Sequence, residues 1–371
     1  MRALLPLVQS SVAAAIRDKP YSYVAATSFE DRDTAWAAFL RDLPTKPRKV
    51  ILFEYDTAVE PRDEDLRCRA ANLGAFEQYF GRSCIHRVSK VNPFAFSALV
   101  RAMQPIISSI TTQQILIDIT CMTRVHALAA VSVMQLVDAR NYTCLYCYTA
   151  PASYGFEIGS HASWKDVLFI PIGKPRLFKR EGHAQGLILA GHDGERLSVA
   201  LQELEPATGT IVYTRRQRRP DLLRKARDAN RTVASRLLAL RVPDDSPAVR
   251  GEQAWRESVL AMEDTRKLER IVTAMVAQAR RDRGPVVVYP FGPKLTMVEV
   301  ALMIAEAPDV DAWVVYPVPA SFDVNYSRGV DVLCALRIAG TTMVSNDKAV
   351  GLSTRRGGGD LETGGAPNNG I

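Results

Sequence analysis

The chain has 371 residues, 47% of them hydrophobic and 23% charged, which is the composition of an ordinary globular protein. Two domains are expected at this length, because a single hydrophobic core seldom grows beyond ~250–300 residues. No apolar run approaches the ~20 residues of a membrane helix, so a membrane protein is not expected. The formal net charge of +7 suggests anionic partners.

The N-terminal residues favour a cytoplasmic protein, and the cysteines suggest neither disulfides nor a metal site. Residues 1–19 are expected to form a leading helix and not a signal peptide, because Asp18 and Lys19 follow without a small-residue cleavage site. Six cysteines are too few for a disulfide scaffold. Cys144 and Cys147 lie three positions apart in a predicted strand, so they point to opposite faces and do not suit a shared metal. We expect free cysteines and no metal site.

Apolar, β-branched runs alternate with helical segments through the first half of the chain. Such alternation predicts βαβ units and a parallel sheet, because buried parallel strands are apolar on both faces. The predicted strands are 21–29, 48–57, 83–91, 113–120 and 141–150. The predicted helices between them are 30–43, 63–80, 92–110 and one that begins near Arg124.

The second half repeats this order. The segment "AQGLILAGHDGERLSVALQEL" follows the pattern of "YSYVAATSFEDRDTAWAAFLRDL", and "PVVVYPFGPKLTMVEVALMI" matches "ILIDITCMTRVHALAAVSVM", with Lys294 in place of Arg124. The segments "YTAPASY" and "YPVPASF" share Tyr and then Pro-Ala-Ser-aromatic at the same spacing. The sequence therefore predicts an α/β fold with two tandem Rossmann-like lobes, which have mainly parallel sheets and are related by internal duplication.

The repeat predicts the domain boundaries. After the N-terminal helix, lobe 1 is expected at 20–160, a linker at 161–183 and lobe 2 at 184–340, with a disordered Gly-rich tail at 341–371. Lobe 2 is expected to carry longer helical segments, at 220–240 and at 251–283. The charged, amphipathic pattern of 251–283 predicts one long helix.

Polar residues gather where predicted strands end, which is the edge at which open parallel sheets bind ligands. Helix N-termini at this edge offer unpaired backbone N–H groups and a partial positive charge, and nearby hydroxyl and basic side chains would add donors for a phosphate. The predicted ligand-binding residues are Thr27, Ser28, Arg32, Thr120, Thr123, Arg124, Arg196, Gly292 and Lys294. Glu30, Asp31 and Asp118 are the candidates for a catalytic acid, base or metal ligand.

Structural roles remain open for several of these residues. Asp118 and Thr120 are also preferred helix caps. Glu30 and Asp31 would favour a helix dipole, and Arg32 could pair with Asp56 or Asp118 as a structural contact. His126 is expected to be a helix-face histidine.

Two further features have alternative interpretations. The aromatic residues of the repeated motif, Tyr154 and Phe322, could fill the core or stack on a base. The basic run 214–231 could bind nucleic acid, but it has no interleaved aromatic residues and is equally typical of a solvated face. Walker A, G-x-G-x-x-G, H-E-x-x-H and G-x-S-x-G motifs are all missing, so NAD binding and the common hydrolase mechanisms are not supported.

The segment "DITCMTRVHALAA", residues 118–130, resembles the signature of CRISPR-associated Rossmann-fold (CARF) sensor domains. In that signature a strand ends in a Thr-Gly-Gly-Thr-Lys-like turn before an Ala-rich helix. Thr120, Thr123 and Arg124 would take the Thr, Thr and Lys positions. Cys121 and Met122 replace the glycine pair, which would narrow backbone approach to a ligand.

The resemblance implies a specific function. Such domains pair two-fold, bind cyclic oligoadenylates across the pair and activate a fused effector, usually a nuclease. Here the two lobes would form the pair within one chain, and we expect the effector to be a separate protein. The expected function is a nucleotide sensor in prokaryotic antiviral defence. The alternatives are an enzyme acting on a nucleotide or nucleic acid through the acidic residues, and a nucleic-acid-binding interaction protein.

Overall fold

The structure is a computed structural model that describes most of the chain up to residue 338. The described residues are 4–56, 63–137, 142–154, 164–173, 183–216, 219–242, 253–319 and 327–338. Met1–Thr341 form one compact unit, and only this unit is considered below. The tail predicted to be disordered, 341–371, lies outside the described residues.

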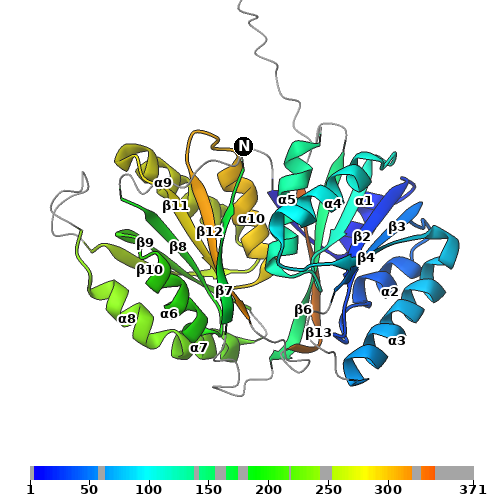
Figure 1. Ribbon diagram of the computed structural model, residues 1–371, viewed down its shortest axis with the longest axis horizontal. Helices are drawn as coiled ribbons and strands as arrows, with labels where there is room; N and C mark the ends of the chain where they lie inside the picture. Colours follow the sequence, from blue (N-terminus) through cyan, green and yellow to red (C-terminus); the bar gives the residue numbers. More distant parts are fainter. Residues whose placement is uncertain are drawn as a thin grey trace, which may run out of the picture. The chain divides into compact units, whose positions relative to one another are not determined.

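Two sheets hold the strands of this unit (Figure 1). The first sheet has seven strands in the order β1-β13-β6-β5-β2-β3-β4, and the second has six in the order β10-β9-β8-β11-β12-β7. The strands of the first sheet are β1 (Leu4–Val8), β2 (Tyr21–Thr27), β3 (Lys49–Tyr55), β4 (Ile85–Val91), β5 (Gln114–Asp118), β6 (Thr143–Tyr154) and β13 (Ser327–Ile338). Those of the second are β7 (Trp164–Pro171), β8 (Gln185–Ala190), β9 (Thr208–Arg215), β10 (Trp255–Ala261), β11 (Val286–Pro290) and β12 (Ala312–Pro319).

The parallel parts of the two sheets have the same strand order. The five strands of β4-β3-β2-β5-β6 are parallel to one another, as are those of β10-β9-β8-β11-β12. In each series the chain first adds strands on one side of its starting strand, β2 or β8, and then on the other side, beginning with β5 or β11. This confirms the predicted fold of two Rossmann-like lobes with mainly parallel sheets. We call the half built on the first sheet lobe 1 and the half built on the second sheet lobe 2.

Each sheet also contains an antiparallel strand from the other half of the sequence. β13 follows β12 in the chain, yet it pairs with β6 and β1 of the first sheet. β7 follows β6, yet it pairs with β12 of the second sheet. The two lobes therefore exchange one strand each, and the segment predicted as a linker, 161–183, contains β7.

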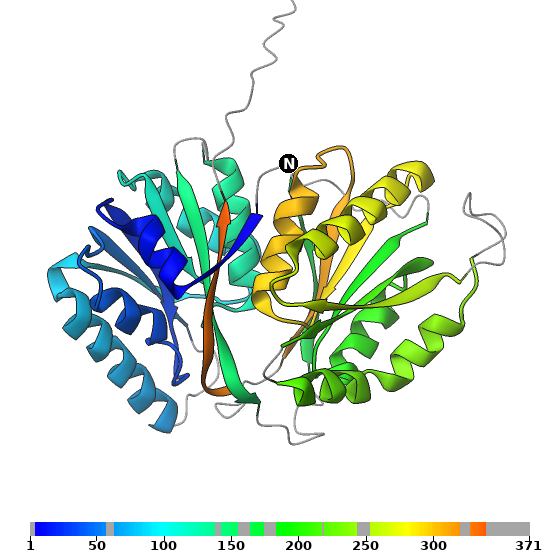
Figure 2. The ribbon, with the colours of Figure 1, turned by 180° about the vertical axis from the view of Figure 1, so that it is seen from behind.

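Helices cover both faces of each sheet (Figure 2). The outer face of the first sheet packs against α1 (Gln9–Ile16), α2 (Ala35–Arg41) and α3 (Asp63–Phe80), and a 3-10 turn, η1 (Arg82–Cys84), follows α3. The outer face of the second packs against α6 (Gly194–Glu203), α7 (Pro220–Ala229) and α8 (Arg231–Ala239). The inner faces share α4 (Phe96–Ser108), α5 (Arg124–Leu136), α9 (Thr265–Asp282) and α10 (Lys294–Ala305).

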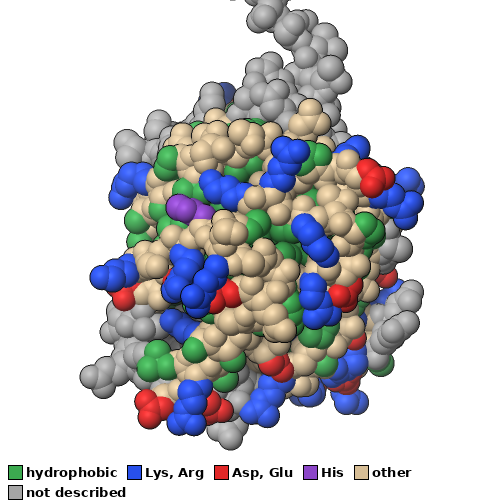
Figure 3. Space-filling view, turned by 90° about the vertical axis from the view of Figure 1, so that its right-hand side faces the viewer, with side chains coloured by type: hydrophobic (Ala, Val, Ile, Leu, Met, Phe, Trp, Pro, Cys, Tyr) green, Lys and Arg blue, Asp and Glu red, His purple; other side chains and the backbone are tan. Residues whose placement is uncertain are grey.

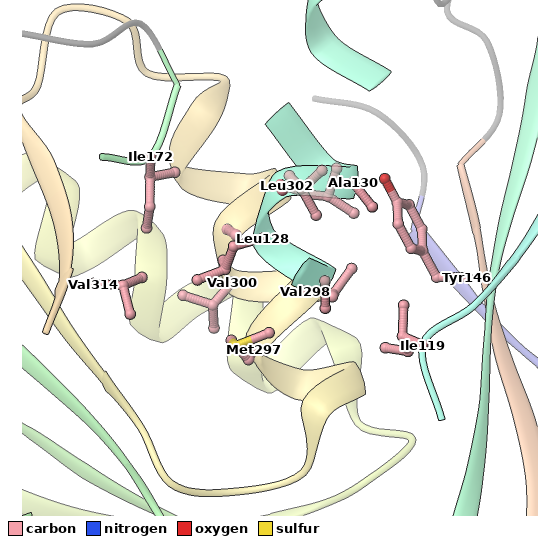
Figure 4. Packing of buried hydrophobic residues seen from close by; sticks show 14 of the residues in the cluster. Ile119, Leu128, Ala130, Tyr146, Ile172, Met297, Val298, Val300, Leu302 and Val314 are labelled. Atoms are coloured by element: carbon pink, nitrogen blue, oxygen red, sulfur yellow. The ribbon is translucent and has the colours of Figure 1, made fainter. Parts of the chain in front are cut away.

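The inner helices join both sheets into one hydrophobic core. Leu128 and Ala130 of α5 lie beside Val300 and Leu302 of α10 between the two sheets (Figure 4). All residues of α10 from 295 to 304 are buried, so this helix has no solvent-facing stripe and must be enclosed by protein. The two helix starts that the sequence singled out, at Arg124 and Lys294, are therefore held next to each other.

The predicted long helix at 251–283 is wrong. Residues Trp255–Ala261 form β10, which pairs in parallel with β9, and α9 begins only at Thr265. β10 is the outermost strand of its sheet, and edge strands commonly carry exposed charges. Arg256 and Glu257 are such charges, and they made a strand resemble the polar face of a helix.

Two other helix predictions also need correction. The segment 220–240 is divided into α7 and α8 at Asn230, whose buried amide donates to the carbonyls of Gly191 and Ala226. The N-terminal helix predicted for 1–19 is confined to α1, because Leu4–Val8 form β1 on the edge of the first sheet.

The cysteine prediction is confirmed for the central pair. Cys144 and Cys147 are both buried in β6, and neither forms a disulfide. Cys144 packs in the core between the sheets, whereas Cys147 packs in the outer core of lobe 1, so they lie on opposite faces. Across the described residues, no helix has the length and apolar character that would let it cross a membrane.

Candidate functional site

A pocket lies where the carboxyl ends of β8, β9 and β11 meet residues of lobe 1, and we call it the interlobe pocket. The space bounded by its lining, open solvent included, is about 640 Å³. β8 and β11 are neighbours at the point where the strand order of lobe 2 reverses, the usual ligand position in open parallel sheets. Its lining residues are Arg32, Arg124, Tyr148, Tyr154, Ala190, Gly191, His192, Thr214, Arg216, Leu222, Ala226, Phe291, Gly292, Pro293 and Lys294.

The pocket depends on a close approach of two loops of lobe 2. A Cβ atom at Gly191 would lie 1.8 Å from the carbonyl oxygen of Phe291, so only glycine allows these loops to touch. The amide of Asn230 donates to the carbonyl of Gly191 at 2.7 Å and fixes the loop from below. Gly191, the first residue after β8, is thus required by packing.

Four basic side chains line the pocket, two from each lobe: Arg32, Arg124, Arg216 and Lys294. Among the described lining residues there is no aspartate or glutamate. Arg32 and Arg216 are 4% and 9% exposed, so the protein dielectric screens their charges less than water would. The described wall of the pocket is therefore basic, although Arg32 and Arg216 each have a carboxylate beside them, Glu30 and Asp331.

Arg124 and Lys294 each donate hydrogen bonds to the loop that precedes the other's helix. Arg124, the first residue of α5, donates to the carbonyl oxygens of Gly292 at 2.7 Å and Phe291 at 3.2 Å, and also to that of Pro290. Lys294, the first residue of α10, donates to the carbonyl oxygen of Thr120 at 2.6 Å. Burial lowers the pKa of Lys294 to about 8, although nearby Glu30 acts in the opposite direction.

Arg32 and Arg216 are held by side chains and backbone carbonyls. Arg32 pairs with Glu30 at 2.6 Å and donates to the carbonyl of Thr149 at 2.6 Å, so the predicted partners Asp56 and Asp118 are wrong. Arg216 donates to the carbonyl of Pro151 at 3.0 Å and lies 3.3 Å from Asp331.

Some donors of these side chains remain available. Within the described part of the chain, Nη2 of Arg32 and Nη1 of Arg124 have no hydrogen-bond partner. Lys294 uses one of its three N–H groups on Thr120. Basic groups that are already positioned and still have donors are suited to bind phosphate oxygens.

Aromatic side chains form another part of the wall. The rings of Tyr154 and His192 lie 5.0 Å apart at an interplanar angle of 47°. Burial, together with the charge of Arg216, lowers the pKa of His192 to about 4, so its ring is neutral at pH 7. A neutral imidazole beside a phenol offers a surface on which a planar base could stack.

Only part of the predicted ligand-binding set lines the pocket. Arg32, Arg124, Gly292 and Lys294 do, whereas Thr27, Ser28, Thr120, Thr123 and Arg196 do not.

The structural interpretation fits the residues that stay outside. Thr123 caps α5 by accepting from the backbone N–H of His126 at 3.1 Å, and Thr120 accepts from the backbone N–H of Thr149 at 2.9 Å. Arg196 pairs with Asp193, and the backbone N–H of Ser28 donates to Asp33 at 2.7 Å.

The candidate catalytic acids are also engaged elsewhere. Glu30 pairs with Arg32 and accepts from Ser327 at 2.7 Å; burial would raise its pKa, but the charges of Arg32 and Lys294 outweigh this and lower it. Asp118 accepts from the hydroxyl of Tyr23 at 2.7 Å and the backbone N–H of Thr120 at 2.9 Å, while burial raises its pKa. Asp31 accepts from the backbone N–H of Gly329 at 2.9 Å. None of the three lines the interlobe pocket.

His126 is fully buried on α5, where its Nδ1 lies 2.7 Å from the hydroxyl of Tyr55. Burial lowers its pKa to about 3, so it stays neutral. In the described ranges, no group of three or more His, Cys, Asp or Glu side chains is placed to hold a metal ion.

The sequence did not single out Arg216 and Tyr148, which both line the pocket. Arg216 was hidden in the basic run 214–231, where the sequence does not distinguish a buried arginine from its exposed neighbours. Tyr148 was identified only as part of the repeated motif.

Three other arginines of the basic run are paired with acids. Their ion pairs are Arg219–Asp221, Arg227–Glu257 and Arg231–Asp228. On the lobe 1 side of the molecule, Lys and Arg side chains are likewise scattered among acids and do not gather into one stripe (Figure 3). Neither observation favours a nucleic-acid surface.

Comparisons with known proteins show no family. No family model matches the sequence, and no curated protein does. Among solved structures, a type III CRISPR defence DNA nuclease activated by cyclic oligoadenylate is 8% identical, with a TM-score of 0.45, over 78% of this chain and 64% of that chain. This chain thus spans less than two thirds of that nuclease.

Two other solved structures are more distant. A functionally unknown protein from Pseudomonas aeruginosa is 12% identical, with a TM-score of 0.21, over 82% of this chain and 94% of that chain. A phosphoethanolamine N-methyltransferase from Haemonchus contortus, in complex with phosphoethanolamine and S-adenosylhomocysteine, is 5% identical, with a TM-score of 0.22, over 89% and 90%. At these TM-scores the similarities carry no argument about function, which has to come from the interlobe pocket.

Proposed function

We propose that the protein binds a nucleotide in the interlobe pocket and acts as a sensor. The observation that carries the proposal is the wall composition: four basic side chains and the rings of Tyr148, Tyr154 and His192, with no carboxylate among the described lining residues. Guanidinium groups recognise phosphate oxygens in a fixed geometry, and aromatic rings stack on bases of any sequence.

The sensor interpretation rests on the position of the pocket between the lobes. A ligand that contacts Arg32 and Tyr154 of lobe 1 and Arg216 and Lys294 of lobe 2 would stabilise one relative arrangement of their loops. Ligand binding can change a protein's state only through such differential contacts. The changed surface would then be read by a separate effector protein.

The finer assignment comes from the sequence signature at residues 118–130. Its resemblance to CARF domains supports a cyclic oligonucleotide as the ligand class and antiviral defence as the setting. The enzyme alternative has less support, because Glu30, Asp31 and Asp118 are engaged in contacts outside the lining. The nucleic-acid alternative has less support because four arginines of the basic run, Arg216, Arg219, Arg227 and Arg231, are paired with acids.

The test is thermal stabilisation of the full chain by a nucleotide panel. The panel holds the four ribonucleoside triphosphates, cyclic AMP, and cyclic tri-, tetra- and hexa-adenylate. A ligand at 100 times its dissociation constant should add ~2.7 kcal/mol to the free energy of unfolding and raise the melting temperature.

Two charge-matched variants locate the site. Arg216→Gln should abolish the shift, whereas Arg215→Gln should not, because Arg215 is the exposed neighbour and does not line the pocket. Absence of a shift with every panel member would refute the proposal.

A further inference from the structure

The two lobes repeat one element order, but their equivalent helix starts differ. Thr123 precedes α5 and accepts from the backbone N–H of His126, which satisfies a first-turn donor. Pro293 precedes α10 and has similar backbone angles, φ −57° and ψ 139° against φ −61° and ψ 162°, but it provides no side-chain cap. Among the described residues, no side chain accepts from the first-turn N–H groups of α10, and Pro293 and Lys294 line the pocket.

The two lobes also differ in charge at equivalent positions, and again lobe 2 is the better suited to bind an anion. The first residue after β9 is Arg216, whereas the first residue after β3 is Asp56. Asparagine amides hold the turns after β2 and β8 in the same way, because Asn72 donates to the carbonyl of Ser28 and Asn230 to that of Gly191. The turns differ in that Asp33 accepts from the backbone N–H of Ser28 in lobe 1, whereas the turn of lobe 2 contributes His192 to the pocket. Lobe 1 therefore places a carboxylate, Asp56, where lobe 2 places the basic Arg216.

Because of these differences, the two lobes do not present equivalent groups to a ligand. Resting on the proposed function, we infer that each chain binds one nucleotide in a single orientation. Its phosphate lies at the uncapped start of α10 among Lys294, Arg124 and Arg216, and its base stacks on Tyr154 and His192. The equivalent position in lobe 1 binds no nucleotide.

The helix start and the ring pair have separable roles in this arrangement. An anion at α10 receives backbone N–H groups and the positive end of the helix dipole in addition to the three cations. The ring pair contributes only when a base is present. A phosphate compound without a base should therefore depend on α10 but not on Tyr154.

Calorimetric titration of the full chain separates these contributions. The probes are inorganic triphosphate and ATP, or in place of ATP the panel nucleotide that gives the largest thermal shift. The wild type should bind one nucleotide per chain. Tyr154→Ala should weaken the nucleotide about 5- to 100-fold and leave triphosphate within twofold, because stacking on an aromatic ring acts on the base alone. Tyr154→Phe, which keeps the ring, should retain nucleotide binding.

A second variant tests the helix start. Pro293→Thr would provide α10 with the cap that Thr123 gives α5, so it should weaken both triphosphate and the nucleotide. Two nucleotides per chain, equal losses of both probes in Tyr154→Ala, or unchanged affinities in Pro293→Thr would overturn the inference and leave the proposed function standing. No binding of either probe by the wild type would remove both.

Discussion

Lys294 is the residue whose protonation should report ligand binding. Its pKa lies near 8 because burial disfavours the ammonium group, so it is mostly charged at pH 7 and mostly neutral at pH 9. A bound phosphate would favour the charged form and raise this pKa. Binding above pH 8 would then take up a proton.

The affinity for a phosphate compound is therefore expected to be nearly constant from pH 7 to 8. Above pH 8 it should fall, by up to about tenfold per pH unit, as one proton becomes linked to binding. Calorimetry in buffers of different ionisation enthalpy measures this uptake directly. Lys294→Arg, which stays charged, should remove the dependence, and an uptake of zero at pH 9 in the wild type would contradict the prediction.

At the scale of single residues, the sequence predicted the basic side chains of the pocket better than its hydroxyl donors. Arg124 and Lys294 were identified because they begin equivalent helices after equivalent strands, and both line the pocket. Thr120, Thr123 and Ser28 were chosen as donors to a ligand, but the backbone uses them first. Caps and ligand donors are the same residue types at the same positions, so spacing alone does not separate them.

At the scale of elements, α10 contains a buried acid without an evident structural partner. Glu299 is 3% exposed, and its Oε1 has no hydrogen-bond partner among the described residues. Burial, with a smaller effect of Asp264 and Glu269, raises its pKa to about 8. The folded chain therefore holds a proton that the unfolded chain loses above its ordinary value of 4.5.

Glu299→Gln should stabilise the protein at neutral pH. The wild type loses stability as the pH rises from 4.5 towards 8, because the unfolded chain releases the proton of Glu299 while the folded chain keeps it. The neutral amide of glutamine avoids this loss. The gain in the free energy of unfolding should be on the order of 1–3 kcal/mol at pH 7 and near zero at pH 4. Denaturant titrations at both pH values measure it. Glu263→Gln, at an exposed position, should give no such gain. An equal effect of Glu299→Gln at pH 4 and pH 7 would contradict the assignment.

The element predictions succeeded where strands are apolar on both faces. β2, β5, β8 and β11 are buried along their whole length and were identified from continuous apolar runs. β10 was missed because a charged edge strand has no such run. The break at Asn230 was also missed, because its cause is a hydrogen bond to a distant loop and not a local signal.

For the whole molecule, the exchanged strands determine how the chain can be divided. A fragment that ends before residue 183 contains β7 but lacks β13, which pairs with β6 along almost its whole length. The remaining fragment contains β13 but lacks β7, the partner of β12. Each fragment then carries a strand that belongs to the other's sheet.

Fragments 1–178 and 179–341 are therefore expected to purify as a stable one-to-one complex when they are coexpressed, and to aggregate when each is expressed alone. Size-exclusion chromatography with light scattering distinguishes the two states. Folded, monomeric behaviour of each separate fragment would show instead that the lobes are autonomous. The lobe boundaries at 20–160 and 184–340 stay a prediction until then.

The repeated element order in the sequence was enough to predict two lobes, but not the exchange between them. The pattern of inward and outward side chains in β7 and β13 is the same whether each strand joins the sheet of its own lobe or that of the other lobe. This pattern does not identify the neighbouring strand. The shared core, in which α5 packs against α10, brings the two sheets together and allows the crossing.

The exchange also determines the order in which the molecule can be completed during synthesis. β6 is finished at Tyr154, but the strand that covers it ends about 180 residues later, at Ile338. At ~5–20 residues per second, a ribosome needs roughly 10–40 s to produce that strand. Throughout this interval the nascent first sheet carries a long open edge, the feature that most readily pairs with other chains. Folding in the cell therefore depends on keeping the edge of β6 from pairing with other chains, for example by chaperones, until translation is almost over.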